Sequence, residues 1–393
     1  MAPHTNTKPV PPLLLTAAYY LSFITLGMVT AAEGPSLPTL ANHTSSRLDQ
    51  ISLIFVFGAL GYLLGSLAGG LAYDRLPGHR FMAITLLVMM AVVGIIPLAA
   101  SLWVLLLVMF SLGFAKGILD VGCNTLLQWV HGEKVGPYMN GLHFFFGLGS
   151  FLSPVLLAQI ISITHEIYWV FWSIALLILP LAFWFWFLPE PAHLHTARQE
   201  RLPIPIAPVT LIVMAFILYV GAETGFGNWI YTYATSLDLA TAVTAAYLTS
   251  AFWGLFTLGR LLGVWVSTRL RPRSILFLDL AGCLASLGLI LLAGNSAPLL
   301  WIGAIGLGLS MASVFPSILM LAGESMRVTG TVTGWFLVGG GLGNMIVPWL
   351  IGQAFTAAGP RAMMNILFVD LIGNLLVLLV FIYSKRVIAL STA

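Results

Sequence analysis

Residues 280–323 read LAGCLASLGLILLAGNSAPLLWIGAIGLGLSMASVFPSILMLAG, forty-four residues without Asp, Glu, Lys or Arg. A second run, residues 81–115, is thirty-five residues long and also uncharged. Helices this apolar have no face for water, whereas the hydrocarbon core of a bilayer takes roughly 20 apolar residues per helical crossing. Each run is therefore long enough for two crossings, with turns at residues 97–101 and 294–298.

The composition of the whole chain agrees with a membrane protein. Charged residues make up 7% of it, against about 25% in soluble domains, and the mean hydropathy is +1.00. The net charge of +3 is too small to indicate a nucleic-acid partner. Residues 1–12 read as a polar tail rather than a cleaved signal. Cys123 and Cys283 fall in apolar segments, so we expect free thiols, and no Cys or His cluster indicates a structural metal.

The apolar segments predict an all-α membrane protein. A backbone that faces lipid must satisfy its own hydrogen bonds, and the alternating ten-residue segments of a β-barrel are absent. We expect twelve transmembrane helices, at residues 13–37, 50–73, 81–99, 102–129, 137–162, 167–188, 208–234, 240–268, 274–294, 298–323, 330–356 and 362–384.

The positions of Lys and Arg predict the orientation, because cytoplasmic loops carry an excess of both. With the N-terminus inside, twelve of them fall in inner loops and tails and only Arg47 and Arg361 fall outside. We therefore expect both termini to be cytoplasmic. The inner set is Lys8, Arg75, Arg80, Lys134, Arg198, Arg201, Arg269, Arg271, Arg273, Arg327, Lys385 and Arg386.

The longest charged interruption lies between Pro189 and Pro208 and contains five prolines, counting both ends. It predicts two six-helix bundles, residues 1–188 and 208–393, joined by a cytoplasmic linker of residues 189–207. The halves also resemble each other. Glycines followed by a late proline recur in the fifth and eleventh helices, ending at Pro154 and Pro348.

The loop after the second helix reads Gly70-Leu-Ala-Tyr-Asp74-Arg75-Leu-Pro-Gly78-His-Arg80. It resembles the signature of the major facilitator superfamily, Gly-x-x-x-Asp-Arg/Lys-x-Gly-x-Arg/Lys, with one extra residue before Gly78. The resemblance implies two bundles of 3+3 inverted repeats around a central cavity, working by alternating access. It also implies gating roles for the signature residues and, at the matching place in the second half, for Arg260 near the end of the eighth helix and Arg269 just after it. We expect Asp74 and Arg75 to act in gating rather than in substrate contact.

The fourth helix carries three polar residues at Lys116, Asp120 and Asn124. The spacing i, i+4, i+8 puts them on one face, which lipid does not suit. Lys116 and Asp120 can pair there. One interpretation is a locked ion pair that fixes packing; the other is a site where a cation, proton or polar substrate competes for Asp120. We expect Asp120 to be the central coupling group and Asn124 to contact substrate.

Two further carboxylates interrupt the first and seventh helices. Glu33 precedes Gly34-Pro35, where the backbone is expected to weaken, and is either an interfacial side chain or a coupling group. Glu223 lies near the middle of the seventh helix, among glycines expected to let the helix bend or break. We expect Glu33 or Glu223 to share ion coupling with Asp120, and Glu223 to contact substrate as well. Asn228 and Trp229 follow it. An amide beside an aromatic ring suits a sugar, although Trp and Tyr are also enriched at membrane surfaces.

The remaining candidates rest on position. Histidine has an ordinary pKa near neutral pH, so His143 is a candidate for ion coupling as a proton relay, although a packed neutral histidine fits as well. Trp253, Trp335 and Asn344 are candidate substrate contacts. Asp279 and Asp370 have no assigned role. Gly339–Gly343 is not a phosphate loop, since no Lys follows and it lies in an apolar helix.

Three segments together resemble the branch of the superfamily with fucose:proton symporters and sodium-dependent glucose transporters: Glu33-Gly-Pro, Asp120-Val-Gly-Cys-Asn124-Thr and His143-Phe-Phe-Phe-Gly. Glu33 and Asp120 match the acidic positions of that branch. The resemblance implies proton- or sodium-coupled uptake of a sugar or similar polar solute. Proton-coupled efflux of amphipathic drugs, transport of a small organic anion with Lys116 as counter-charge, and a non-transporting sensor remain alternatives.

No ATPase motif and no water-exposed Ser/His/Asp arrangement occurs, so we expect a transporter driven by a gradient and not an enzyme. We expect no cofactor beyond a transported proton or sodium ion. The expected partners are a small-molecule substrate and membrane lipids, in a monomer of the bacterial inner membrane.

Overall fold

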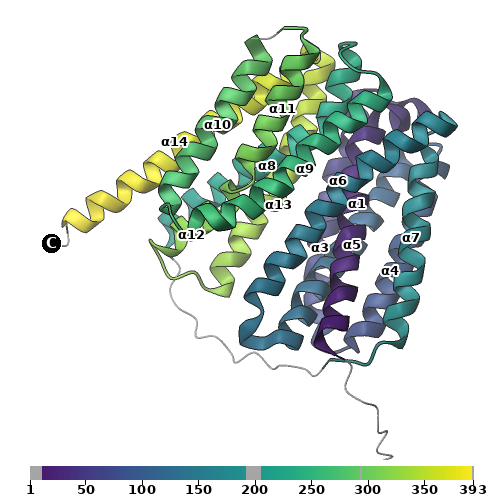
Figure 1. The fold of residues 1–393 in the computed structure, drawn as a ribbon, viewed down its shortest axis with the longest axis horizontal. Coiled ribbons are helices and arrows are strands. Elements are labelled where there is room, and N and C mark those ends of the chain that lie inside the picture. The colour runs from purple at the N-terminus through teal and green to yellow at the C-terminus, as the bar shows by residue number, and fades with distance from the viewer. Residues whose placement is uncertain (1–10, 192–204, 293, 392–393) are drawn as a thin grey trace, which may run out of the picture.

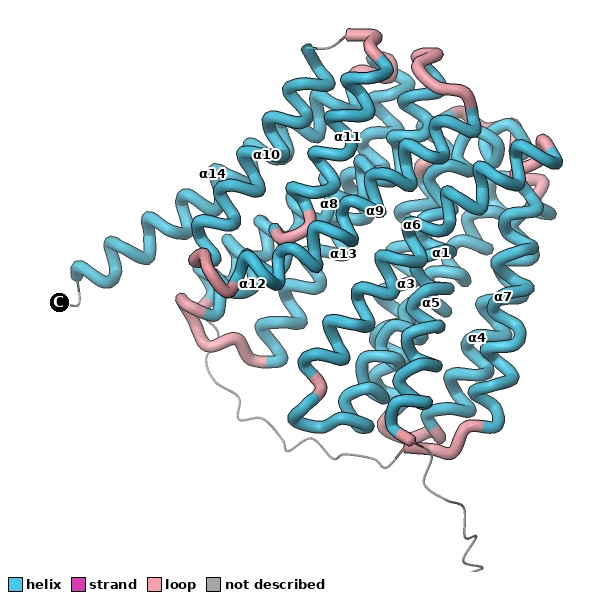
Figure 2. Tube along the Cα trace, in the orientation of Figure 1, coloured by secondary structure: helices cyan, strands magenta, loops and turns pink. Residues whose placement is uncertain are grey.

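The computed structural model describes residues 11–191, 205–292 and 294–391, and the regular structure of this part is entirely helical (Figure 2). The described residues contain 12 helical segments long and apolar enough to cross a membrane, so the predicted fold class is confirmed. Large apolar side chains cover the outside, among them Leu67 at 69% exposure and Phe187 at 80%. Such a surface suits lipid rather than water as the surrounding solvent.

The helices follow the predicted order. The first half contains α1 (Pro12–His43), α2 (Leu48–Ile51), α3 (Leu53–Tyr73), α4 (Gly78–Ile95), α5 (Leu102–His131), α6 (Gly136–Thr164) and α7 (Tyr168–Phe187). The second half contains α8 (Ile206–Ser236), α9 (Ala242–Ser267), α10 (Pro272–Leu292), α11 (Ala297–Met311), α12 (Val314–Gly323), α13 (Gly330–Ala358) and α14 (Ala362–Ser391). The proposed linker of residues 189–207 lies largely outside the described residues.

Local sequence explains where these helices begin and break. The Ser101 hydroxyl accepts the Val104 N–H and caps α5, and Thr241 does the same for Thr244 at the start of α9. The tenth crossing is divided into α11 and α12 at Ala312–Ser313. Pro316 explains this break, because a proline four residues on leaves the Ala312 carbonyl without its helical donor.

Two expectations about weak backbone are corrected. α1 does not end near Pro35 but continues to His43, with Pro35 and Pro38 inside the helix. α8 is also continuous through its glycines. These glycines serve close packing instead: a Cβ on Gly221 would lie 2.4 Å from Val347, and one on Gly227 would lie 2.5 Å from the Trp253 ring.

Glycines on α3 and α5 bring these two helices into backbone contact. A Cβ on Gly61 of α3 would lie 2.0 Å from the Phe110 carbonyl oxygen, and one on Gly117 of α5 would lie 2.3 Å from that of Tyr62. Small residues are the usual means of close helix association in membranes. This crossing places Tyr62 directly beside the polar face of α5.

The two halves form side-by-side bundles (Figure 1). We call the end of the molecule where α1 and α8 begin the terminal end, and the opposite end the distal end. Successive crossings alternate in direction between these ends (Figure 1). Among the described residues, several hydrogen bonds join the two bundles in the distal halves of their helices or at the middle of α6.

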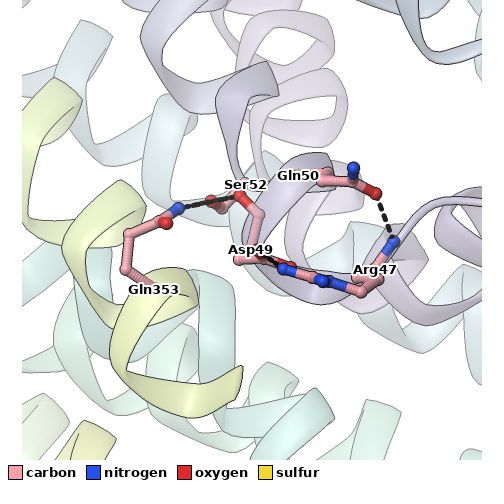
Figure 3. Close-up of polar contacts among 5 residues, drawn as sticks. All are labelled: Arg47, Asp49, Gln50, Ser52 and Gln353. Carbon is pink, nitrogen blue, oxygen red and sulfur yellow. Dashed lines mark hydrogen bonds and ion pairs between the residues drawn. The ribbon is translucent and has the colours of Figure 1, made fainter. Parts of the chain in front are cut away.

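One of these distal contacts joins α13 to α2 and α3 (Figure 3). The Gln353 side-chain amide donates to the Asp49 carbonyl oxygen at 2.8 Å and to the Ser52 hydroxyl at 3.3 Å. A Cβ on neighbouring Gly352 would lie 2.4 Å from that of Ser52. Asp49 is itself held by an ion pair with Arg47. The bundles therefore meet tightly at this end.

A second distal contact joins α6 to α9. Ser250 donates its hydroxyl to the Phe151 carbonyl oxygen at 2.8 Å, and the Gln159 amide donates to the Tyr247 hydroxyl. Nearer the terminal end, α6 and α9 still approach at Gly147 and Thr257, where a Cβ would lie 2.4 Å from the Thr257 hydroxyl. The structure is thus closed at its distal end.

Candidate functional site

Lys116 of α5 forms an ion pair with Glu33 of α1, with 2.5 Å between Nζ and Oε1. Both side chains are largely buried, at 10% and 14% exposure. The expected pair of Lys116 with Asp120 inside one helix is therefore not the one that forms. The side chain of Glu33 reaches Lys116 from the neighbouring helix, a contact that intrahelical spacing cannot reveal.

Asp120 is held by neutral groups instead. Its Oδ1 accepts the Asn124 amide at 2.8 Å, and its Oδ2 accepts the hydroxyl of Tyr62. No Lys or Arg in the described chain forms an ion pair with Asp120. Asp120 and Asn124 are both half-buried. The structure thus brings together three of the predicted residues, Glu33, Lys116 and Asp120, and leaves one carboxylate without a cation.

A second group of charges lies on the other half. Glu223 of α8 is half-buried, and Arg260 of α9 is close enough to act electrostatically on both Glu223 and His143. The Arg260 guanidinium sits 4.4 Å above the Phe256 ring. His143 belongs to α6 of the first half and is exposed, although it lies two turns inside the helix. Arg260 thus lies inside α9, about two turns from its end at Ser267.

The structure places the predicted substrate contacts in different surroundings. Trp229 is fully buried, and its indole N–H donates to the Pro348 carbonyl oxygen at 2.9 Å. Its ring packs near Phe55 and Phe355. Trp229 therefore ties α8 to α13 and presents no free donor.

The other four candidates have varied surroundings. Trp253 and Asn228 are buried, at 6% and 8% exposure. Asn344 is half-buried, and Trp335 lies near the terminal end of α13 at 52% exposure.

The signature loop lies at the terminal end. Gly70, Asp74, Arg75, Arg80 and Arg269 are exposed, whereas Gly78 is buried at the start of α4. Among the described residues, Asp74 forms no ion pair with the second half. Arg269, just past α9, sits 4.3 Å from the Trp265 ring of that helix. These residues are thus separate from the Glu33–Lys116 pair and Asp120, and their gating role stays a prediction.

Glu190, just past α7, holds the start of α4. Its carboxylate accepts the backbone N–H groups of His79 at 2.8 Å and Arg80 at 3.2 Å. The buried His79 ring uses both nitrogens, one with the Pro189 carbonyl oxygen at 2.6 Å and one with the Tyr19 hydroxyl at 2.7 Å. An anion at a helix N-terminus satisfies free N–H groups and complements the helix dipole.

Sequence reasoning missed several of these residues. Tyr62, Ser52, Ser250 and Gln353 are single polar side chains in apolar segments, and nothing in their spacing marks a role. Tyr62 gains its role only because glycines bring α3 against α5. Cys123 and Cys283 are both buried, free thiols.

Two bundles of membrane-spanning helices with ionisable groups held inside them are the architecture of a membrane transporter. The chain belongs to the Major Facilitator Superfamily, whose family model matches residues 19–348. The sequence-based assignment to this family is therefore confirmed, and so is the prediction that the chain is not an enzyme.

Several curated relatives align with most of the chain. It is 30% identical to sodium-dependent glucose transporter 1 of Danio rerio over 86% of this chain and 64% of that protein. It is 28% identical to sodium-dependent glucose transporter 1A of Mus musculus, over 85% and 88%. It is 24% identical to major facilitator superfamily domain-containing protein 4A of Homo sapiens, over 94% and 92%.

Solved structures share the fold. A point mutant of the nucleoside transporter NupG superposes with a TM-score of 0.74 at 15% identity, covering 95% of this chain and 99% of that one. An inward-facing, occupied bacterial homologue of the human lysosomal transporter Spinster also gives a TM-score of 0.74, at 14% identity, covering 95% and 96%.

Proposed function

We propose that this protein is a cation-coupled transporter that takes up a hexose or a similar polyol by alternating access. The proposal rests on one observation: two neighbouring carboxylates have different partners. Glu33 is neutralised by Lys116, whereas Asp120, one turn from Lys116, has only Tyr62 and Asn124 as side-chain partners in the described part of the chain. Keeping an ionised group inside a membrane costs about 2.5–3.5 kcal/mol, so an uncompensated carboxylate there needs a reason.

A coupling cation supplies that reason. A proton would neutralise Asp120, and a sodium ion would take its oxygens as ligands, as hard cations do. Either would compete with the hydrogen bonds from Tyr62 and Asn124. Any solute contact that depends on the charge of Asp120 would then depend on the cation, and linkage makes this effect reciprocal.

The central charges are also close to the distal contact between the halves. Glu33 precedes Gly34, whose missing side chain lets α1 lie against the backbone of Asn228 on α8. A change in the Glu33–Lys116 pair therefore acts on the same turn of α1 that closes the distal end. This supports alternating access, with Asp74 and Arg75 as the proposed gate at the opposite end.

The choice of a sugar rests on the relatives and on the side chains available. Two of the relatives reported above are named as sodium-dependent glucose transporters. The amide of Asn124 lies beside Asp120, and polyols are recognised by such groups. The alternative of a small organic anion loses its counter-charge, because Lys116 is already paired with Glu33.

The test is uptake by the purified protein in liposomes. We expect saturable accumulation of labelled D-glucose when an inward sodium or proton gradient is imposed, and none when both gradients are collapsed. Accumulation of an amphipathic drug or an organic anion, with no hexose uptake under any gradient, would contradict the proposal. The same panel separates proton from sodium coupling.

We further propose a monomer in the bacterial inner membrane with the terminal end in the cytoplasm. The bias of Lys and Arg toward the terminal end supports this orientation. A cysteine at the exposed distal position Ser45 should react with an impermeant thiol reagent added to cells, and one at exposed Arg271 should not. Labelling of Arg271→Cys from outside would refute the orientation.

A further inference from the structure

Trp253 of α9 carries a buried indole N–H that has no hydrogen-bond partner in the described chain. The residue is 6% exposed, so water does not replace the missing acceptor readily. Leaving a buried donor unpaired costs more than a hydrogen bond gains, and native proteins rarely do so without a reason. Trp229 shows the contrast, because its N–H is satisfied by Pro348.

The ring of Trp253 is already packed and is not a free stacking surface. Phe252 and Phe256 approach it edge-on, with centroid distances of 5.0 and 5.6 Å. On another side, a Cβ on Gly227 would lie 2.5 Å from Cζ2 and 3.0 Å from Cε2 of the indole. Cε2 is bonded to the indole nitrogen, so the N–H edge lies along α8 at Gly227. The N–H is thus the one polar function that Trp253 offers.

Asn228 follows Gly227 directly, and its side-chain amide forms no hydrogen bond within the described residues, although the residue is only 8% exposed. Its backbone lies against Gly34, next to the paired Glu33. An N–H that can only donate therefore lies against the turn of α8 that carries an amide able both to donate and to accept, and this turn contacts α9 at Gly227 and α1 at Asn228. Two neighbouring hydroxyls match such a set, since one accepts from the indole and the other exchanges hydrogen bonds with the amide.

We propose that the indole N–H of Trp253 and the side-chain amide of Asn228 bind adjacent hydroxyls of the transported solute and select among polyols by where those hydroxyls stand. The inference rests on the proposed function, and it identifies the groups of the second half that hydrogen-bond to the solute. Because Trp253 has no acceptor, it requires an oxygen at one particular position of the sugar. A solute without that oxygen leaves the indole unpaired and binds more weakly.

The experiment combines Trp253→Phe with a set of monodeoxy sugars. This substitution keeps an aromatic ring in the packed site and removes the N–H. Uptake of D-glucose and of its 2-, 3-, 4- and 6-deoxy analogues is measured in liposomes for the parent, for Trp253→Phe and for Trp103→Phe. Trp103 is 74% exposed on α5 and serves as the matched control.

We expect Trp253→Phe to raise the half-saturating glucose concentration about three- to tenfold, the effect of one neutral hydrogen bond. In the parent, one deoxy analogue should bind more weakly than glucose by a similar factor. Trp253→Phe should not weaken the binding of that analogue any further. Trp253→Phe should weaken the binding of the remaining analogues by the same factor as the binding of glucose. The control should change nothing.

An equal loss for every analogue, or no change with glucose, would overturn the role of Trp253 while leaving hexose transport intact. Absence of hexose uptake by the parent would instead refute the proposed function and the inference with it. If Trp253→Phe does not fold, Asn228→Ala replaces it in the same experiment. The analogue that lacks the hydroxyl bound by Asn228, which is adjacent to the one bound by Trp253, should then bind Asn228→Ala as strongly as it binds the parent.

Discussion

Gly34 of α1 and Asn228 of α8 touch through their backbones across the two halves of the protein. A Cβ on Gly34 would lie 2.5 Å from the Asn228 carbonyl oxygen and 2.6 Å from its Cα. Backbone atoms cannot move aside as a flexible side chain does. The close approach of α1 to α8 therefore depends on the absence of a methyl group beside the Glu33–Lys116 pair.

Gly34→Ala should open the distal end. The added methyl can be accommodated only if α1 and α8 separate, so the equilibrium shifts away from the distally closed state. Ser250, which is 2% exposed in the α6–α9 contact, reports this when replaced by Cys. Its labelling by an impermeant maleimide should become several-fold faster. The control is Gly288→Ala, where no atom lies within 4 Å of the new methyl; equal rates in both variants would refute the mechanism.

Removal of one partner of the Glu33–Lys116 pair should destabilise the protein more than removal of both. Lys116→Met leaves a buried carboxylate without a cation, and breaking such a pair costs about 3 kcal/mol or more. Glu33→Gln leaves the ammonium unpaired. The double variant has no uncompensated charge and should recover much of the loss. Thermal unfolding in detergent measures this, and strictly additive losses would show that the two groups do not interact.

The cap of α4 by Glu190 should contribute measurably to stability. Glu190→Ala leaves the N–H groups of His79 and Arg80 without their acceptor, which by analogy with helix caps costs about 1 kcal/mol. Glu190→Gln keeps one acceptor oxygen, so its unfolding temperature should lie between those of the parent and Glu190→Ala. Glu133→Ala removes an exposed carboxylate as the matched control. Unfolding temperatures that rank the glutamine variant below the alanine variant would contradict this account.

The sequence predicted the parts of the fold that depend on one segment at a time. Twelve crossings follow from hydropathy alone, since a helix in lipid must be apolar along its length. The signature from Gly70 to Arg80 likewise identified the family. Glycines were harder to interpret: Gly221 and Gly227 look like points of weakness, yet each is a place where another helix approaches.

The site could be predicted only in part, because its partners come from different helices. The spacing of Lys116 and Asp120 fits a pair, but Glu33 reaches Lys116 from α1 and Tyr62 reaches Asp120 from α3. Trp229 and Trp253 look alike in sequence. Only packing shows that the first has its N–H satisfied and the second does not.

The account depends most on Asp120 as the group that couples cation to solute. Asp120→Asn keeps the shape of the side chain and removes its charge, and Asn124 and Tyr62 can still hydrogen-bond to it. The decisive measurement compares this variant with the parent in liposomes, for glucose accumulation driven by a sodium or proton gradient and for exchange of glucose at equal concentrations. We predict that accumulation is abolished while exchange survives. Accumulation by Asp120→Asn with the parent's response to sodium and pH would show that Asp120 is structural and would contradict the proposed mechanism.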